Sequence, residues 1–98
     1  MRGSLKQKQA KLEQDIAAGG EDMRQFMISS GDIVTASLEL KKSGEGYAVA
    51  LRFKSGGSHR RTVGTVSDQT RDKALKAGWD LVRASHLIPR NGWKWLRP

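Results

Sequence analysis

The sequence predicts an α+β fold built from an N-terminal helical segment, a three-stranded antiparallel β-meander and a C-terminal helix packed on one sheet face. Two observations predict it. Apolar residues recur at helical spacing near both ends of the chain but alternate with polar residues between positions 33 and 66. Two glycine-rich turns divide this alternating stretch into strands. We therefore expect a helical arm over residues 1–30 and a ββ-β-α domain over residues 31–98, with a possible extra C-terminal strand.

The N-terminal arm is predicted to form two helices. Residues 4–18 are good helix formers, and a thin apolar stripe runs along them at Leu5, Leu12 and Ile16. Gly19 and Gly20 end this helix, because glycine is costly inside a helix and suits its C-terminal end. A second short helix is expected over residues 21–29. Its apolar face, at i, i+3 and i+4, consists of Met23, Phe26 and Met27.

Three strands follow, over residues 33–41, 47–54 and 59–66. Alternation places every second side chain on the same sheet face. The residues expected to face the core are Val34, Ala36, Leu38, Leu40, Tyr47, Val49, Leu51 and Phe53. The turns "KSGEG" and "SGGS" make the three strands an antiparallel meander with one buried and one solvated face.

The stretch after residue 70 permits two interpretations. Helix N-caps are available at Ser67, Asp68 and Thr70, and one apolar face follows at Leu75, Trp79 and Val82. The favoured interpretation is one helix that runs to about His86 and stops before Pro89. Gly78 opposes it, since glycine costs about 1 kcal/mol inside a helix. The alternative ends the helix near Ala77 and pairs a strand over residues 79–88 with "WKWLR" across the turn "RNG".

Composition and charge limit the classes of function. The 98 residues contain no cysteine, so neither a disulfide nor a thiolate metal site is expected, and a reducing cytoplasm is the expected location. No apolar run is long enough for a membrane span or a secretory signal, so no membrane association is expected. The net charge is +8, and residues 71–98 contribute seven basic against two acidic groups. A sequence pI near 10.3 is typical of nucleic-acid-binding domains.

The sequence lacks the residue groupings that most enzymes need. His59 and His86 are 27 positions apart, without a His, Cys or Asp grouping at metal-ligand spacing, so neither a metal nor a cofactor is expected. No phosphate-binding loop or nucleophile elbow is present. One catalytic alternative stays open: a small toxin-like ribonuclease with His59 as general base and Arg60 or Arg61 stabilising the transition state.

Basic residues gather on the second hairpin, in "RFKSGGSHRR". Antiparallel strands can enter the major groove of DNA as a ribbon. Because successive residues point to opposite faces, Arg60 and Arg61 cannot both lie on the open face of a regular strand. The alternative is that these basic residues only keep an exposed sheet face hydrated and bind no ligand. The candidate nucleic-acid-binding residues are Arg52, Lys54, His59, Arg60 and Arg61, with Lys73, Lys76 and Arg83 extending the track.

The segment "YAVALRFKSGGSHRRTVGTVSDQTRDKALKAGWDLVRA" resembles the sheet-plus-helix DNA-binding domains of the AP2 type and the N-terminal arm-binding domains of tyrosine recombinases. The matching positions, within residues 33–88, are Arg52, Lys54, Gly57, Arg60, Arg61, Val63, Gly64 and Ala74. Val66 stands where those domains commonly have an aromatic residue. The resemblance implies a sheet inserted into the major groove of duplex DNA. The order of elements also resembles a double-stranded RNA-binding fold, in which Arg71 and Lys73 would mark the start of the second helix.

The C-terminus places Trp93 and Trp95 on either side of Lys94. In an extended segment both indoles share one face, which suits base stacking or partner docking, although the alternative is that they close the core. We expect a small basic protein that binds nucleic acid through residues 31–98, with duplex DNA favoured over RNA. The alternative function is an inhibitor or adaptor of the phage or mobile-element kind, which docks on a larger nucleic-acid-processing protein through the Trp-rich tail or the helical arm.

Overall fold

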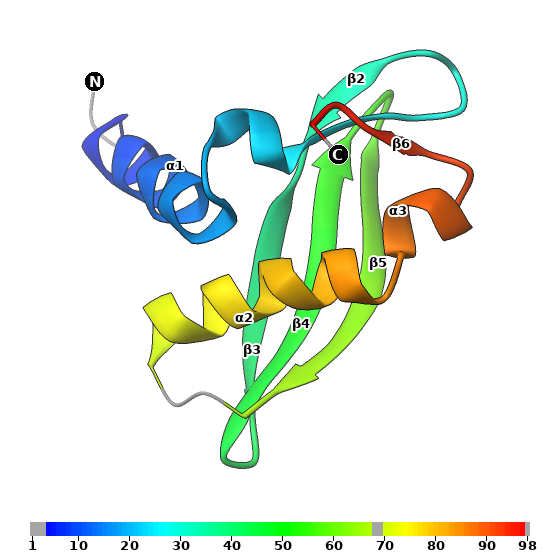
Figure 1. The fold of residues 1–98 in the computed structure, drawn as a ribbon. Coiled ribbons are helices and arrows are strands. Elements are labelled where there is room, and N and C mark those ends of the chain that lie inside the picture. The colour runs from blue at the N-terminus through cyan, green and yellow to red at the C-terminus, as the bar shows by residue number, and fades with distance from the viewer. Residues whose placement is uncertain (1–3, 68–69, 98) are drawn as a thin grey trace.

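A computed structural model describes residues 4–67 and 70–97 (Figure 1). Two three-stranded antiparallel sheets are combined with helices in one α+β domain. The helical elements are α1 (Ser4–Ala18), the 3-10 helix η1 (Glu21–Arg24), α2 (Arg71–Ala84) and α3 (Leu87–Arg90). The strands are β1 (Gln25–Met27), β2 (Ile33–Thr35), β3 (Ser37–Ser43), β4 (Gly46–Lys54), β5 (Ser58–Val66) and β6 (Lys94–Trp95).

The predicted meander is the larger sheet, with strand order β3-β4-β5. Its register pairs Leu38 with Leu51, and Leu51 in turn with Arg61. The register shifts at Val49/Ala50, where β5 contains one extra residue, Val63. The smaller sheet has the order β2-β1-β6 and lies at one end of the larger one (Figure 1). Alternation within the chain therefore predicted the main sheet correctly.

The predicted strand over residues 33–41 is divided between the two sheets. β2 pairs with β1 and β3 pairs with β4, and the chain changes sheet at Ala36. There the backbone of Ala36 pairs with Arg24: the Ala36 N–H donates to the Arg24 carbonyl at 3.0 Å, and Arg24 Nε donates to the Ala36 carbonyl at 2.9 Å. Arg24 is buried, and its guanidinium also pairs with Asp15 and donates to Ser37 Oγ at 3.0 Å.

The second predicted helix, over residues 21–29, is wrong beyond its first turn. Only η1 is helical, and Gln25–Met27 form strand β1. Within β1, Phe26 is fully buried whereas Met27 is 40% exposed, so the segment follows the strand period and not the helical one. Pairing with both β2 and β6 gives the β1 backbone hydrogen-bond partners that a short helix cannot supply.

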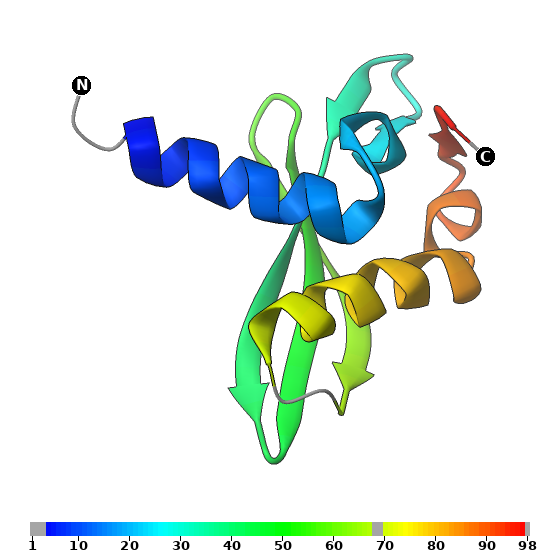
Figure 2. The ribbon, with the colours of Figure 1, turned by 60° about the vertical axis from the view of Figure 1, so that its left-hand side comes forward.

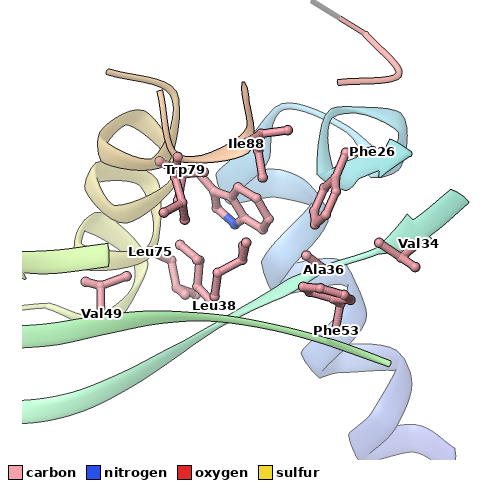
Figure 3. Close-up of a cluster of buried hydrophobic side chains, with 12 residues drawn as sticks. Phe26, Val34, Ala36, Leu38, Val49, Phe53, Leu75, Trp79 and Ile88 are labelled. Atoms are coloured by element: carbon pink, nitrogen blue, oxygen red, sulfur yellow. The ribbon is translucent and has the colours of Figure 1, made fainter. Parts of the chain in front are cut away.

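Helix α2 covers one face of the meander through Leu75, Trp79 and Val82, which pack with the core-facing strand residues. Figure 3 shows Leu75 and Trp79 beside Leu38. Gly78 permits this close packing. A Cβ atom added at Gly78 would lie 2.8 Å from Leu38 Cδ1 and 3.1 Å from Val49 Cγ1. The glycine that argued against a continuous helix is thus the residue at which the helix approaches the sheet.

The long-helix interpretation is confirmed, because α2 continues to Ala84, and the strand alternative over residues 79–88 is wrong. Thr70 is the N-cap of α2, while Asp68 lies outside the described residues. His86 adopts a left-handed conformation with φ 56°, and α3 then includes Pro89 in its single turn. The extra C-terminal strand exists as β6, but its partner is β1.

Helix α1 is attached to the edge of the meander by a buried glutamine. Gln14 Nε2 donates to the Leu38 carbonyl at 3.0 Å, and the Leu38 N–H donates to Gln14 Oε1 at 3.0 Å. The same Oε1 accepts the Trp79 indole N–H at 3.2 Å. The amide therefore continues the hydrogen-bonding pattern of edge strand β3 and joins it to α2. By contrast, two residues of the predicted apolar stripe of α1 are outside the core, since Leu12 is 58% and Ile16 72% exposed. The side chain of the third, Leu5, lies outside the described residues.

Candidate nucleic-acid interface

The face of the meander opposite to α2 is open. Figure 2 shows α1 and α2 on the same side of the β3-β4-β5 sheet. Cross-strand pairing places Arg52 of β4 opposite Arg60 of β5, and the strand period adds Lys41 and Lys54 to the same face. The guanidinium-bearing side chains of Arg52 and Arg60 are 50% and 58% exposed. The basic residues on this open face are Lys41, Arg52, Lys54 and Arg60.

Glu39 orients both arginines of the open face. Arg52 Nη1 donates to Glu39 Oε2 at 3.0 Å, and Arg60 Nε donates to Glu39 Oε1 at 2.9 Å. Hydrogen bonding from Arg60, together with the charge of Arg52, lowers the pKa of Glu39, which keeps the carboxylate ionised. Of the residues in β3, β4 and β5, Glu39 alone is acidic. The face therefore keeps a positive balance, with each guanidinium retaining N–H donors beyond those that Glu39 accepts.

A hollow of about 530 Å³ adjoins the open face beside β3. Arg52 and Lys54 line it together with Arg71, the first residue of α2, which also pairs with Glu13 at 2.9 Å. The sequence placed Arg71 at the start of the helix but outside the candidate track. Its position beside the sheet depends on the connection between β5 and α2, for which the sequence has no periodic signal.

Arg60 and Arg61 lie on opposite faces of β5, as the alternation predicted. Arg60 belongs to the open face, whereas Arg61 pairs in register with the buried Leu51 and so points to the helix side. There the Arg61 guanidinium lies 5.4 Å from the centre of the Trp93 ring. Only one of the two adjacent arginines can therefore contact a ligand lying flat on the open face.

His59 is on the helix side too. Its ring stacks on Phe53, with centroids 5.0 Å apart and 17° between the planes. Its Nε2 lies 3.0 Å from the Ser55 carbonyl. Because a carbonyl oxygen only accepts, Nε2 carries the hydrogen and donates it. The remaining ring nitrogen, Nδ1, is the one available to a ligand.

The three predicted extensions of the track lie away from the open face. Lys73 and Lys76 line a hollow of about 460 Å³ between α1 and α2, together with the exposed Leu12 and Ile16. Arg83 covers the Trp95 ring at 3.9 Å and donates to the carbonyls of residues 23 and 97, at 3.3 and 3.2 Å. Burial lowers the pKa of Arg83.

The two C-terminal tryptophans pack against the core. Trp93 stacks on Phe26, with centroids 5.2 Å apart and 17° between the planes, and Trp95 meets the same ring edge-on at 6.0 Å. Lys94 between them is exposed. Of the two interpretations that the sequence left open, core closure is confirmed for both indoles, although each remains only partly buried.

Comparison of the chain with models of known protein families, with curated proteins and with solved structures found no match. The resemblance to sheet-plus-helix DNA-binding domains therefore stays a prediction. None of the helices that the structure describes is long and apolar enough to cross a membrane.

Proposed function

We propose that this protein binds duplex DNA through the open face of the β3-β4-β5 sheet. The observation that carries the proposal is the placement of four basic side chains on a face that no described helix covers, with Glu39 as the single acidic residue of the three strands. The net charge of +8 adds a long-range attraction for a polyanion.

The shape of this face favours DNA over RNA. A two-stranded β-ribbon fits the major groove of B-form DNA, which is about 12 Å wide. The major groove of an A-form RNA helix is deep and narrow, so side chains on a sheet cannot reach its bases. The hairpin of β4 and β5 presents Arg52 and Arg60 side by side, as a ribbon in the major groove requires. Glu39 holds both guanidiniums in defined positions over the sheet before DNA arrives.

The number of basic groups on the open face predicts the salt dependence. Each phosphate contact by a basic side chain contributes about −0.9 to the slope of log K against log salt concentration. Four contacts, from Lys41, Arg52, Lys54 and Arg60, correspond to a slope of about −3.6. Affinity would then fall by about 150-fold between 50 and 200 mM salt.

The test is fluorescence anisotropy with labelled duplex DNA, duplex RNA and single-stranded DNA at several salt concentrations. We expect Arg52→Gln/Arg60→Gln to reduce the magnitude of the slope for duplex DNA by about 2. The matched control is Lys73→Gln/Lys76→Gln, which removes the same charge from the helix side and should leave the slope nearly unchanged. If both double substitutions weaken DNA binding equally, net charge alone explains the weakening, and the open face is not the DNA-binding site.

The adaptor is the second candidate function, and the observation that favours it is the pair of exposed apolar residues Leu12 and Ile16 beside the hollow between α1 and α2. Exposed apolar patches of this kind mark contact surfaces. No binding to any of the three nucleic acids at low salt would exclude the DNA proposal and favour the adaptor. Loss of partner binding in Leu12→Gln/Ile16→Gln would then support docking through the helical arm.

A further inference from the structure

A second basic surface lies at the end of the meander, on the helix side. The β4–β5 turn, the β1–β2 connection and the segment before β6 lie at this end of the molecule (Figure 1). Their residues line a hollow of about 320 Å³. This volume is at the lower end of the range of ligand pockets, about 300–1,000 Å³, and suits one small unit rather than a duplex. The polar and aromatic residues that line it are Ser29, Ser30, Phe53, Ser55, His59, Arg61 and Trp93.

Arg61 is held in this pocket without a carboxylate. The rings of Phe26 and Trp93 are stacked, and the guanidinium of Arg61 lies over the Trp93 ring at 5.4 Å, so aromatic contact orients it. Its Nη1 donates to the carbonyl of Arg60 at 3.1 Å. No carboxylate among the described residues forms an ion pair with Arg61, whereas Glu39 pairs with both arginines of the open face. A guanidinium oriented in this way retains donors for a phosphate.

His59 supplies a second oriented plane. Stacking on Phe53 and the hydrogen bond from Nε2–H to the Ser55 carbonyl hold the ring at the pocket wall. The half-buried ring leaves Nδ1 as an acceptor when neutral and as a donor when protonated. Planar rings and guanidinium planes are the surfaces on which unpaired bases stack.

We propose that this pocket binds one unpaired nucleotide of a strand whose duplex part lies on the open face, with the phosphate at Arg61 and the base against the planes of His59 and Arg61. The inference rests on the proposed function. β5 is an edge strand, and its consecutive residues Arg60 and Arg61 face opposite sides. A single strand leaving the duplex can therefore pass around this edge from one basic surface to the other. The preferred ligand is a duplex with a short single-stranded overhang.

The test compares a blunt duplex with the same duplex carrying a short overhang. We expect the wild-type protein to bind the overhang duplex about tenfold more tightly, a gain typical of one stacked base. Arg61→Met should lose this gain and keep the affinity for blunt duplex. The matched control is Arg90→Met. Arg90 is on α3, is not among the residues that line the pocket, and pairs with no described carboxylate. Its Nη1 donates to the Ser85 carbonyl at 3.2 Å. His59→Ala should reduce the gain without affecting blunt-duplex binding.

The outcomes separate the two proposals. Equal wild-type affinity for blunt and overhang duplexes would overturn the inference and leave the proposed function intact. If neither duplex binds, the proposed function fails, and titration with a nucleoside monophosphate then tests the pocket alone by the NMR shift of the Trp93 indole N–H. No shift would overturn the inference. The same shifts and affinity with inorganic phosphate would also overturn it, because the base would then contribute nothing.

Discussion

The side-chain amide of Gln14 holds the edge of the main sheet, and replacing it with methionine tests how much this contact stabilises the fold. Gln14 is buried and makes three hydrogen bonds, with the N–H and carbonyl of Leu38 and with the indole N–H of Trp79. Methionine has nearly the same length and shape but can make none of these three bonds. Gln14→Met therefore removes the amide while preserving most of the packing.

The expected loss of stability follows from the three buried polar groups that Gln14→Met leaves without a hydrogen-bond partner. Each buried donor or acceptor left without a partner costs about 1–3 kcal/mol. Burying the more apolar methionine side chain offsets about 1 kcal/mol. Taking values near the lower half of the range for each group, we expect the free energy of unfolding to fall by about 3 kcal/mol. That is a large fraction of the total stability of about 5–15 kcal/mol that is typical of a domain, and the Tm should fall by about 12–24 °C.

Urea unfolding measures the change, with Gln9→Met as the matched control. Gln9 lies on the same helix but is exposed, so its substitution should change the stability by less than about 0.5 kcal/mol. Hydrogen exchange supplies a local readout, since the amide of Leu38 should lose protection only in Gln14→Met. A Gln14→Met protein within about 0.5 kcal/mol of wild type, with the Leu38 amide still protected, would refute the reasoning.

Three further predictions concern the packing of α2 and the open face. Gly78→Ala should lower the stability by about 1–2 kcal/mol in urea unfolding, because the clash of its Cβ with Leu38 and Val49 exceeds the gain of about 1 kcal/mol in helix propensity; an increase in stability would contradict the close approach of helix and sheet. Glu39→Gln should raise the affinity for duplex DNA roughly threefold in anisotropy titrations, since it removes the acidic residue of the open face, whereas Glu45→Gln in the β3–β4 turn is the control and should change little. Because the pKa of Glu39 is lowered in the folded protein, its contribution to stability is present above the ordinary carboxyl pKa and is lost as the pH falls through the lowered value. Glu39→Gln should therefore make the stability fall less steeply at acidic pH. If unfolding at acidic pH is the same in wild type and Glu39→Gln, the result would count against the ion pairs of Glu39 with Arg52 and Arg60.

Local periodicity was sufficient to predict the type of each element that is long enough to show its period. Helix α1, the three strands of the meander and helix α2 all follow patterns that extend over seven or more residues. The same alternation predicted that Arg60 and Arg61 face opposite sides, which divides the candidate site into two surfaces. The residues of the open face therefore follow from the sequence once the meander is recognised.

Short segments were not determined by their own pattern. Met23, Phe26 and Met27 fit a helical face, yet β1 is a strand because β2 and β6 supply its hydrogen-bond partners. Likewise, nothing in the sequence around Ala36 indicates the change of sheet, which depends on the buried side chain of Arg24. A segment of three residues has too little periodicity to outweigh backbone hydrogen bonds with partners far along the chain.

The sequence by itself determined the fold class, the main sheet and the residues that line its open face, because each depends on a repeating pattern within one stretch of chain. Only the tertiary structure decided that Gln14 closes the sheet edge and that Trp93 packs beside Arg61. These contacts join residues 24 and 32 positions apart, and no local pattern records which distant segments will meet. Their pairing follows from the burial of Phe26, Leu38 and Trp79 in one core, which brings α1 and the segment around Trp93 against the main sheet.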